Sequence, residues 1–190
     1  VWMAKNLRST RYADGTPIPK VEGNSSWSNL SYNDKAFCWY LDDSVTYAES
    51  NGAYYNFAAA NNGENSTANP SGVQGACPDG WHIPSNVEWQ ELIDYLAQAG
   101  HDGTQGTVLK DTESWLTNDG TDLYGFSGMA IGVRGFNGSF VAFNEGCGFL
   151  SSTENSNSTF DFHNLLDGIA YISIAEGSKE SGISIRCIKN

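Results

Sequence analysis

Cys77-Pro78-Asp79-Gly80-Trp81-His82-Ile83-Pro84-Ser85-Asn86-Val87-Glu88-Trp89 leads into the clearest helix of the sequence. Ser85 and Glu88 have the spacing of a capping box, in which each side chain satisfies a free backbone N–H in the first helical turn. Apolar residues then recur at helical spacing on one side and polar residues on the other: Val87, Trp89, Leu92, Ile93 and Leu96 against Glu88, Glu91, Asp94 and Gln98. The sequence therefore predicts an amphipathic helix that starts after Ser85, stops near Gly100 and buries only the first of these two sets.

Composition and charge limit the class of protein. The chain has 190 residues, of which 39% are hydrophobic and 13% aromatic, and this is enough for an ordinary core in one domain spanning residues 1–190. The net charge is -12 and only ten Lys and Arg are present, so we expect neither nucleic acid nor an anionic bilayer as a partner. No apolar run is long enough for a membrane span, which argues against direct membrane insertion.

The four cysteines, at positions 38, 77, 147 and 187, are too widely spaced for the paired C-x-x-C pattern of zinc sites. Their even number fits two disulfides formed in an oxidising compartment, and the sequence alone leaves three pairings open. Val1-Trp2-Met3 has no signal-peptide character, so we expect that any export signal or lipid anchor has been removed. These features predict an exported domain.

The rest of the sequence predicts an α+β fold in which strands dominate. The chain is expected to open with a strand and a hairpin whose turn is Asp14-Gly15-Thr16-Pro17. Two aromatic segments follow, around Cys38–Leu41 and Gly52–Ala60. Long loops are expected at 61–75 and 100–128. Expected strands of a closing antiparallel sheet are Met129–Val133, Gly138–Phe143, Cys147–Ser152, Ile169–Ala175 and Ile183–Ile188.

Several motifs resemble, in order and spacing, those of the Fibrobacter succinogenes major paralogous domain, and the resemblance covers essentially the whole chain. The motifs are Val1-Trp2-Met3-Ala4-Lys5-Asn6-Leu7, Cys38-Trp39-Tyr40, Cys77-Pro78-Asp79-Gly80-Trp81-His82-Ile83-Pro84, Gly125-Phe126-Ser127-Gly128, Ser151-Ser152-Thr153-Glu154 and Gly182-Ile183-Ser184-Ile185-Arg186-Cys187-Ile188. That family occurs in exported and lipid-anchored proteins of Bacteroidetes and related bacteria, and it looks like a variant of the C-type lectin fold. The resemblance implies a Cys77–Cys187 disulfide and, with it, the pair Cys38–Cys147.

A narrower resemblance lies within residues 153–187. This segment is similar to the variable region of proteins that are diversified by diversity-generating retroelements. Certain positions, here called the frame residues, match those proteins, and the positions between them carry residues of mixed types. The frame residues are Thr153-Glu154-Asn155, Leu165, Ile172, Lys179, Gly182 and Arg186-Cys187. The resemblance implies a variable recognition surface, whereas ordinary drift in a surface loop would give the same single sequence.

No catalytic, cofactor or metal site is expected. The histidines His82, His101 and His163 lack the spacing of a ligand pair, and we expect His82 to pack and hydrogen-bond near the helix cap. No G-x-S-x-G motif occurs. The carboxylate pairs Asp42-Asp43 and Asp119 with Asp122 are typical of turns rather than of a glycosidase.

Two loops contain residues that could bind a ligand, and each also has a purely structural interpretation. The loop Asn118–Asp122 offers hard oxygen ligands suited to Ca²⁺, but we expect a plain turn because the full calcium-loop pattern is missing. Trp27 lies between Ser26 and Ser28, so a sugar-stacking platform is an alternative to a core position. The other five tryptophans are expected in the core or at its rim: Trp2, Trp39, Trp81, Trp89 and Trp115.

The candidate binding site lies in the segment 155–178. In the expected strand Ile169–Ala175, the apolar set Ala170, Ile172 and Ile174 is predicted to face inward. The predicted outward patch combines Ile169, Tyr171 and Ser173 with residues of the preceding loop, namely Phe160, Phe162, His163, Asn164 and Leu166. The alternative is that both sides of this strand are core.

The function expected from these features is that of a non-catalytic exported binding module. It would recognise a protein or a glycan through residues 155–178, in an extracellular or outer-membrane surface location. The rival functions are a surface carbohydrate-active hydrolase and a structural or adhesive subunit.

Overall fold

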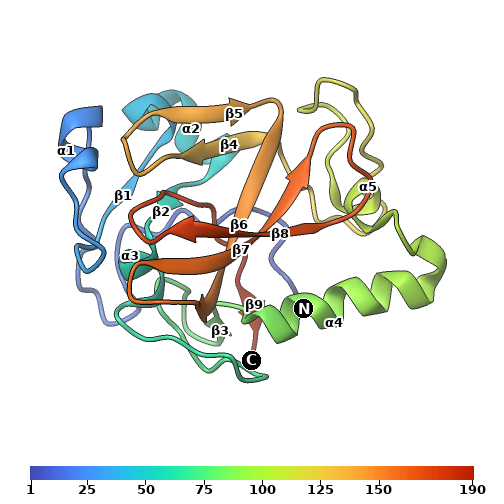
Figure 1. Cartoon of the computed structure of the whole chain (residues 1–190), viewed down its shortest axis with the longest axis horizontal. Helices are drawn as coiled ribbons and strands as arrows, with labels where there is room; N and C mark the ends of the chain where they lie inside the picture. Colours follow the sequence, from blue (N-terminus) through green and yellow to red (C-terminus); the bar gives the residue numbers. More distant parts are fainter.

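The computed structural model describes residues 1–190 and is built around a curled five-stranded sheet of order β5-β4-β6-β7-β8 (Figure 1). Its strands are β4 Ile131–Arg134, β5 Phe140–Phe143, β6 Gly146–Glu154, β7 Thr159–Leu166 and β8 Ser173–Ser178. Neighbouring strands are antiparallel except β4 and β6, which run parallel through the pair Gly132 and Cys147. The sheet is therefore mixed rather than wholly antiparallel, and it contains β7, whose residues were expected to form a loop.

Short elements complete the α+β fold (Figure 1). Two antiparallel pairs join β1 Phe37–Cys38 with β2 Tyr54–Tyr55, and β3 Trp81–His82 with β9 Ile188–Lys189. The helical elements are α1 Asn24–Ser28, η1 Tyr40–Asp42, α2 Ser44–Asn51, α3 Phe57–Asn61, α4 Asn86–Leu96, η2 Ala97–His101 and α5 Gln105–Leu109. The longest of these, α4, packs against β6 and β7.

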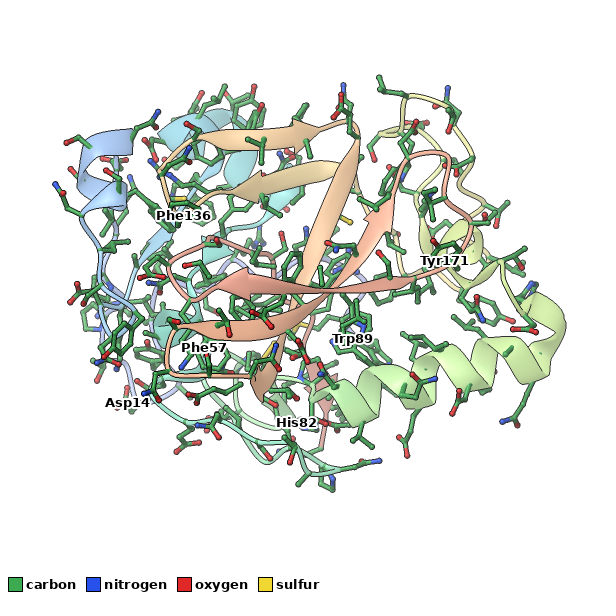
Figure 2. All side chains as sticks on the ribbon, in the orientation of Figure 1. Asp14, Phe57, His82, Trp89, Phe136 and Tyr171 are labelled. Carbon is green, nitrogen blue, oxygen red and sulfur yellow. A yellow bond between two sulfur atoms is a disulfide. The ribbon has the colours of Figure 1, made fainter.

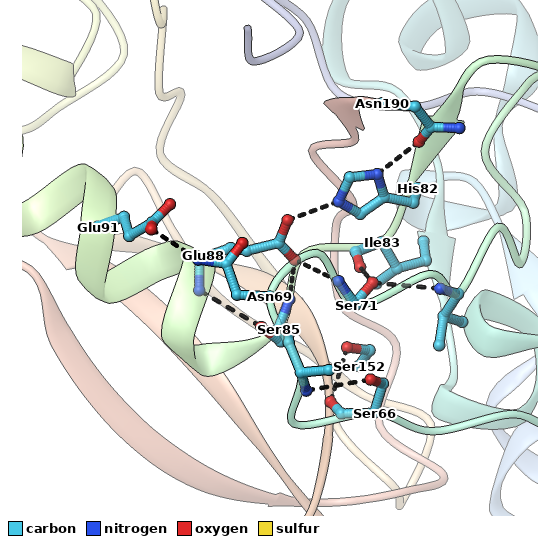
Figure 3. A network of polar contacts seen from close by, with 12 residues as sticks. Ser66, Asn69, Ser71, His82, Ile83, Ser85, Glu88, Glu91, Ser152 and Asn190 are labelled. Atoms are coloured by element: carbon cyan, nitrogen blue, oxygen red, sulfur yellow. Dashed lines mark hydrogen bonds and ion pairs between the residues drawn. The ribbon is translucent and has the colours of Figure 1, made fainter.

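The start of α4 confirms the predicted capping box. Ser85 Oγ accepts a hydrogen bond from the Glu88 N–H at 3.3 Å, and Glu88 Oε2 accepts one from the Ser85 N–H at 3.0 Å. The predicted apolar face is inward at Trp89 and Leu96, which are buried, and at the half-buried Leu92 and Ile93. The first turn differs from the prediction, because Glu88 is only 3% exposed whereas Val87 is 45% exposed. Glu88 faces inward because its carboxylate has further partners, Ser71 and His82, in a neighbouring loop and strand (Figure 3).

The N-terminal segment lies alongside the buried segment 183–187 near the C-terminus. The N–H of Met3 donates to the carbonyl of Cys187, and the N–H of Leu7 donates to the carbonyl of Ile185, each at 3.0 Å. The expected strand at 183–188 is instead a buried segment whose bridges lead to different partners, Ile183 to Tyr55 and Ser184 to Phe149. The segment thus links several parts of the core instead of extending one ladder.

The interior consists of two apolar clusters, of 19 and 15 buried residues. Trp27 belongs to the second cluster and is completely buried, so the alternative of a sugar-stacking platform is wrong. The Arg134 guanidinium lies 4.5 Å from the centre of the Trp27 ring, and the indole N–H donates to the carbonyl of Glu180 at 2.9 Å. The polar neighbours of Trp27 in sequence gave no sign of these distant partners.

Arg186 is a buried cation that joins the N-terminal segment to the loop before β4. It is 1% exposed and donates to Asn6 Oδ1 at 2.6 Å, to the Ser127 carbonyl at 2.8 Å and to the Phe126 carbonyl. Burial lowers the pKa of its guanidinium to about 10. The charge is therefore retained at neutral pH and is satisfied mainly by oxygen dipoles.

The Cys77–Cys187 disulfide is present, which confirms the first pairing. The second is wrong, because Cys38 and Cys147 are buried free thiols. Cys38 lies in β1 opposite Tyr54, Cys147 lies in β6 opposite Leu165, and both side chains fill positions of the second apolar cluster. Burial raises the pKa of each thiol to about 12, so both are protonated and behave as small apolar groups.

Removal of the disulfide tests how strongly it stabilises the fold. The bridge joins residues separated by 110 positions, and the chain-entropy estimate for a loop of this size is about 4 to 5 kcal/mol. We expect the double variant Cys77→Ala/Cys187→Ala to lose a free energy of unfolding of this order in urea denaturation. The matched control is Cys38→Ala, which removes a buried sulfur without opening a loop. Equal losses in the two proteins would contradict a stabilising cross-link.

Candidate functional site

The predicted binding residues lie mostly on the β7–β8 hairpin, whose ladder runs from the pair Thr159 and Ser178 to the pair Asn164 and Ser173. Cross-strand partners point to the same side of a sheet, so the ladder sorts the side chains into two faces. The face toward α4 carries Asp161, His163, Ile174 and Glu176, and the opposite face carries Phe160, Phe162, Asn164, Ser173 and Ala175. The hairpin therefore divides the predicted patch between its two sides.

Two of the predicted residues lie on the face away from α4 and pack against the first apolar cluster. Phe160 is completely buried, with its ring 5.0 Å from that of Phe57. Phe162 is partly buried and packs against the first apolar cluster. Its ring lies against Gly148 and Gly177, where an added Cβ would approach it to 3.0 and 2.9 Å. Phe160 is a core residue, so its assignment to a surface patch is wrong, whereas Phe162 is half-buried on the same face.

His163 is also buried, in this case on the face toward α4. It is 4% exposed and stacks on Trp89 of α4, with ring centres 4.8 Å apart. Its Nε2 lies 3.3 Å from the side-chain oxygen of Asn86. Burial lowers the pKa of the imidazole to about 4, and the nearby Asp161 only partly opposes this shift. His163 is therefore a neutral packing residue and not part of an exposed patch.

The remaining predicted residues are at least partly accessible. Tyr171 is 54% exposed and Leu166 is 37% exposed, while Asn164, Ile169 and Ser173 are half-buried. Tyr171 lies beside α5 at one end of the hairpin (Figure 2). The turn that carries it is held in place, because the Ala170 carbonyl accepts from the Thr107 N–H at 3.0 Å and the Ile169 carbonyl accepts from Lys110 Nζ at 3.0 Å.

Ile174 was predicted to face inward and is 56% exposed. The reason is that β8 starts at Ser173, so residues 169–172 are not strand and the alternation predicted across them does not apply. Ile172 does pack against the second cluster, and Ala170 is half-buried. Ile174 is therefore a surface residue that sequence reasoning placed on the wrong side.

Polar side chains adjoin Ile174 on the same face. Asn86 Nδ2 donates to Asp161 Oδ2 at 2.5 Å, and Asn155 donates to the other oxygen of Asp161 and, at 3.4 Å, to Glu176. Neither Asp161 nor Glu176 is among the binding residues predicted from the sequence. The sequence signal for this strand is the alternation of Phe160 and Phe162 with Asp161 and His163, which predicts a strand with one apolar and one polar face. We define the hairpin surface as Tyr171, Ile174, Asn155, Asp161 and Glu176.

The carboxylates considered for hydrolysis are engaged within the chain. Asp42 pairs with Arg134 at 2.8 Å, and Asp43 caps α2 by accepting from the Val45 and Thr46 N–H groups. In the other pair, Asp119 lies 2.6 Å from Lys110 Nζ, and Asp122 accepts from the Ser127 N–H at 2.6 Å. All four carboxylates therefore have at least one partner within the chain.

Histidines and possible metal ligands give no further site. His82 lies between Glu88 and Asn190, each 2.6 Å from one of its ring nitrogens, which confirms its predicted place beside the helix cap. No group of three or more His, Cys, Asp or Glu side chains is arranged to hold a metal ion. None of the helices combines the length and the apolar character that a membrane crossing requires.

The burial of His163 makes stability depend on pH. The unfolded chain binds a proton near the ordinary pKa of 6.5, whereas the folded protein does so only near pH 4. Stability is thus fully present above pH 6.5 and falls as the pH is lowered toward 4, by about 3 kcal/mol at most from this group. Urea denaturation should show this loss in the wild type and a weaker one in His163→Phe. Identical profiles would contradict a buried neutral histidine.

Comparison with known proteins gives one result. No curated protein and no solved structure matches the chain significantly. A family model, the Fibrobacter succinogenes major domain, matches residues 1–189. The match extends over both apolar clusters, the disulfide and the β7–β8 hairpin. The chain therefore belongs to the Fibrobacter succinogenes major domain family.

Proposed function

We propose that the chain is a non-catalytic binding module that recognises a protein ligand at the bacterial cell surface through the hairpin surface. The observation that carries this proposal is the exposure of two large apolar side chains on the hairpin, Tyr171 at 54% and Ile174 at 56%. Neither is needed to fill a core, and Ile174 lies on the same face of the hairpin as Asp161 and Glu176. Apolar anchors bordered by polar groups are typical of protein interfaces.

The backbone under these side chains is held in a fixed geometry. β8 pairs with β7 along its whole length, and β7 pairs in turn with β6 at the centre of the sheet. A binding surface on such a frame loses little conformational freedom when a ligand docks, which favours affinity. Most of the frame residues around the segment are buried, namely Thr153, Leu165, Lys179, Gly182, Arg186 and Cys187, whereas Glu154 and Ile172 are half-buried and Asn155 is exposed.

The charge of the hairpin surface indicates the kind of ligand. Asp161 and Glu176 contribute two carboxylates, and Asn155 adds an amide, within a chain of net charge -12. A partner with basic side chains around an apolar centre would complement this surface. Association with such a partner weakens as salt concentration rises, because the Glu176 carboxylate is exposed to solvent and that of Asp161 is only half-buried.

The location and origin of the surface belong to the same proposal. The Cys77–Cys187 disulfide fits an oxidising compartment and thus an extracellular or outer-membrane site. A C-type-lectin-like fold would suit a sheet of this kind with long loops. Diversification of residues 155–178 by a retroelement would place varied side chains on the fixed backbone of the hairpin.

Binding assays on a protein array test the proposal. The purified chain would be applied to immobilised extracellular bacterial and host proteins, together with Tyr171→Ala and Ile174→Ser. We expect both variants to lose the array signals of the wild type, with changes in unfolding free energy below about 0.5 kcal/mol because the side chains are exposed. The matched control is Val45→Ala, since Val45 is 95% exposed on α2, away from the hairpin.

Two results would refute the proposal. If the hairpin variants keep every array signal, recognition occurs elsewhere on the molecule. If Tyr171→Ala instead loses several kcal/mol of stability, as a buried tyrosine would, the residue is structural and the hairpin surface is not a free binding surface.

A further inference from the structure

A small pocket lies on the side of the β7–β8 hairpin away from α4, under the turn between β6 and β7. Phe57, whose ring contacts Phe160, lines it, and Figure 2 shows Phe57 and Tyr171 at opposite ends of the hairpin. The pocket has a volume of about 180 Å³, and four separate parts of the chain meet around it. The side chains used below are Tyr32, Phe57, Asn65, Glu154, Asn157 and Lys179.

The charged group of this pocket is almost completely buried. Lys179 is 6% exposed, and its ammonium lies 2.8 Å from Glu154 Oε1 and 5.0 Å from the centre of the Phe57 ring. An ammonium has three hydrogen-bond donors, and Glu154 takes up only one of them. Lys179 therefore keeps donor capacity at a pocket that is wide enough to admit a ligand.

The carboxylate opposite Lys179 is fixed as well. Glu154 Oε2 accepts from Asn65 Nδ2 at 2.6 Å, while its Oε1 faces Lys179. Each carboxylate oxygen can accept more than one hydrogen bond, so Glu154 keeps acceptor capacity beside the donors of Lys179. The pocket thus presents a donor and an acceptor side by side on groups that are already oriented.

The charges around the pocket point to an uncharged ligand. Glu154 compensates Lys179, and Glu64 at the rim adds a further negative charge, which disfavours an anion. A cation gains little here, because the Glu154 carboxylate is already paired with the Lys179 ammonium and Glu64 is exposed to solvent at the rim. A hydroxyl group both donates and accepts a hydrogen bond, so it can use Lys179 and Glu154 together.

The shape and the aromatic rings narrow the class of ligand. The volume of about 180 Å³ is below the range of about 300 to 1,000 Å³ that is usual for drug-sized ligands, and it suits a single ring. Phe57 and the 41% exposed Tyr32 offer apolar surfaces, and the exposed amides of Asn65 and Asn157 add polar groups at the rim. We propose that this pocket binds one neutral monosaccharide unit of a glycan.

This site is separate from the hairpin surface, and the two proposals do not depend on each other. Asn155 and Asp161 belong to the hairpin surface, whereas Glu154 lies opposite Phe160 in the ladder and faces the pocket with Lys179. A variant at Tyr171 should therefore leave sugar binding unchanged. A variant of the pocket should leave binding to a protein ligand unchanged.

NMR titration of the ¹⁵N-labelled chain tests the assignment. The probes are D-glucose, D-galactose, D-mannose and N-acetylglucosamine, with sodium phosphate as the charged comparison. We expect at least one sugar to shift the amide signals of Asn65 and Asn157 with a Kd of about 1 to 10 mM, as suits a small polar ligand. Phosphate should leave these signals unchanged.

Two variants and one control complete the test. Lys179→Met keeps the apolar part of the side chain and removes the donors, and we expect affinity to fall by about tenfold or more. Tyr32→Ala/Asn157→Ala removes two exposed rim residues and should weaken binding similarly, so it decides the question if Lys179→Met does not fold. Tyr171→Ala should bind the sugar as the wild type does.

Three results would overturn the assignment. These are the absence of any shift with all four sugars, shifts confined to residues outside the pocket, and unchanged affinity in the rim variant. A phosphate-induced shift at Asn65 and Asn157 would refute the choice of a neutral ligand.

Discussion

The buried carboxylate of Glu88 is the constraint on which the arrangement of α4 and its surroundings depends. It accepts hydrogen bonds from the N–H groups of Ser85 and Ser71 at 3.0 and 3.1 Å, and its other oxygen lies 2.6 Å from His82 Nε2 (Figure 3). Through His82 the network reaches Asn190 at the end of β9. One side chain thus joins the start of a helix, a loop and a two-stranded sheet. A buried carboxylate of this kind is stable only while its partners are present, so these segments order one another.

The position of α4 in turn fixes the face of the β7–β8 hairpin. Trp89, one residue after Glu88, stacks on His163, and Asn86 in the first turn bonds to Asp161. The disulfide acts in the same region, because Cys77 precedes β3 and Cys187 precedes β9. The exposed side chains of the hairpin therefore rest on a support that is fixed by buried polar groups and by a covalent bond.

Local patterns in the sequence were sufficient to predict the capping box, the extent of α4 and the place of His82. These patterns were insufficient to predict burial wherever a side chain is buried by contacts with residues far away in the sequence. Helical periodicity assigns Glu88 to the solvent side, because the spacing of residues within the helix carries no information about His82 and Ser71, which lie outside it. Trp27, in a polar segment, is buried by Arg134, a residue far away in the sequence. The residues of β7 were predicted to form a loop, although Phe160 and Phe162 alternate with polar residues. The predicted binding site therefore includes the buried side chains of Phe160 and His163. Tyr171 was predicted to be exposed and is, while Ile174 was missed because the start of β8 depends on its pairing with β7.

A double-mutant cycle between His82 and Glu88 tests the role of this network most directly. The unfolding free energies of the wild type, His82→Ala, Glu88→Ala and the double variant would be measured in urea. Because a buried hydrogen bond to a carboxylate is stronger than one between neutral groups, we predict a coupling energy of about 1.5 to 3 kcal/mol. Effects of the two single variants that add within about 0.5 kcal/mol would contradict the account, since the helix and the β3–β9 sheet would then be held together by other contacts.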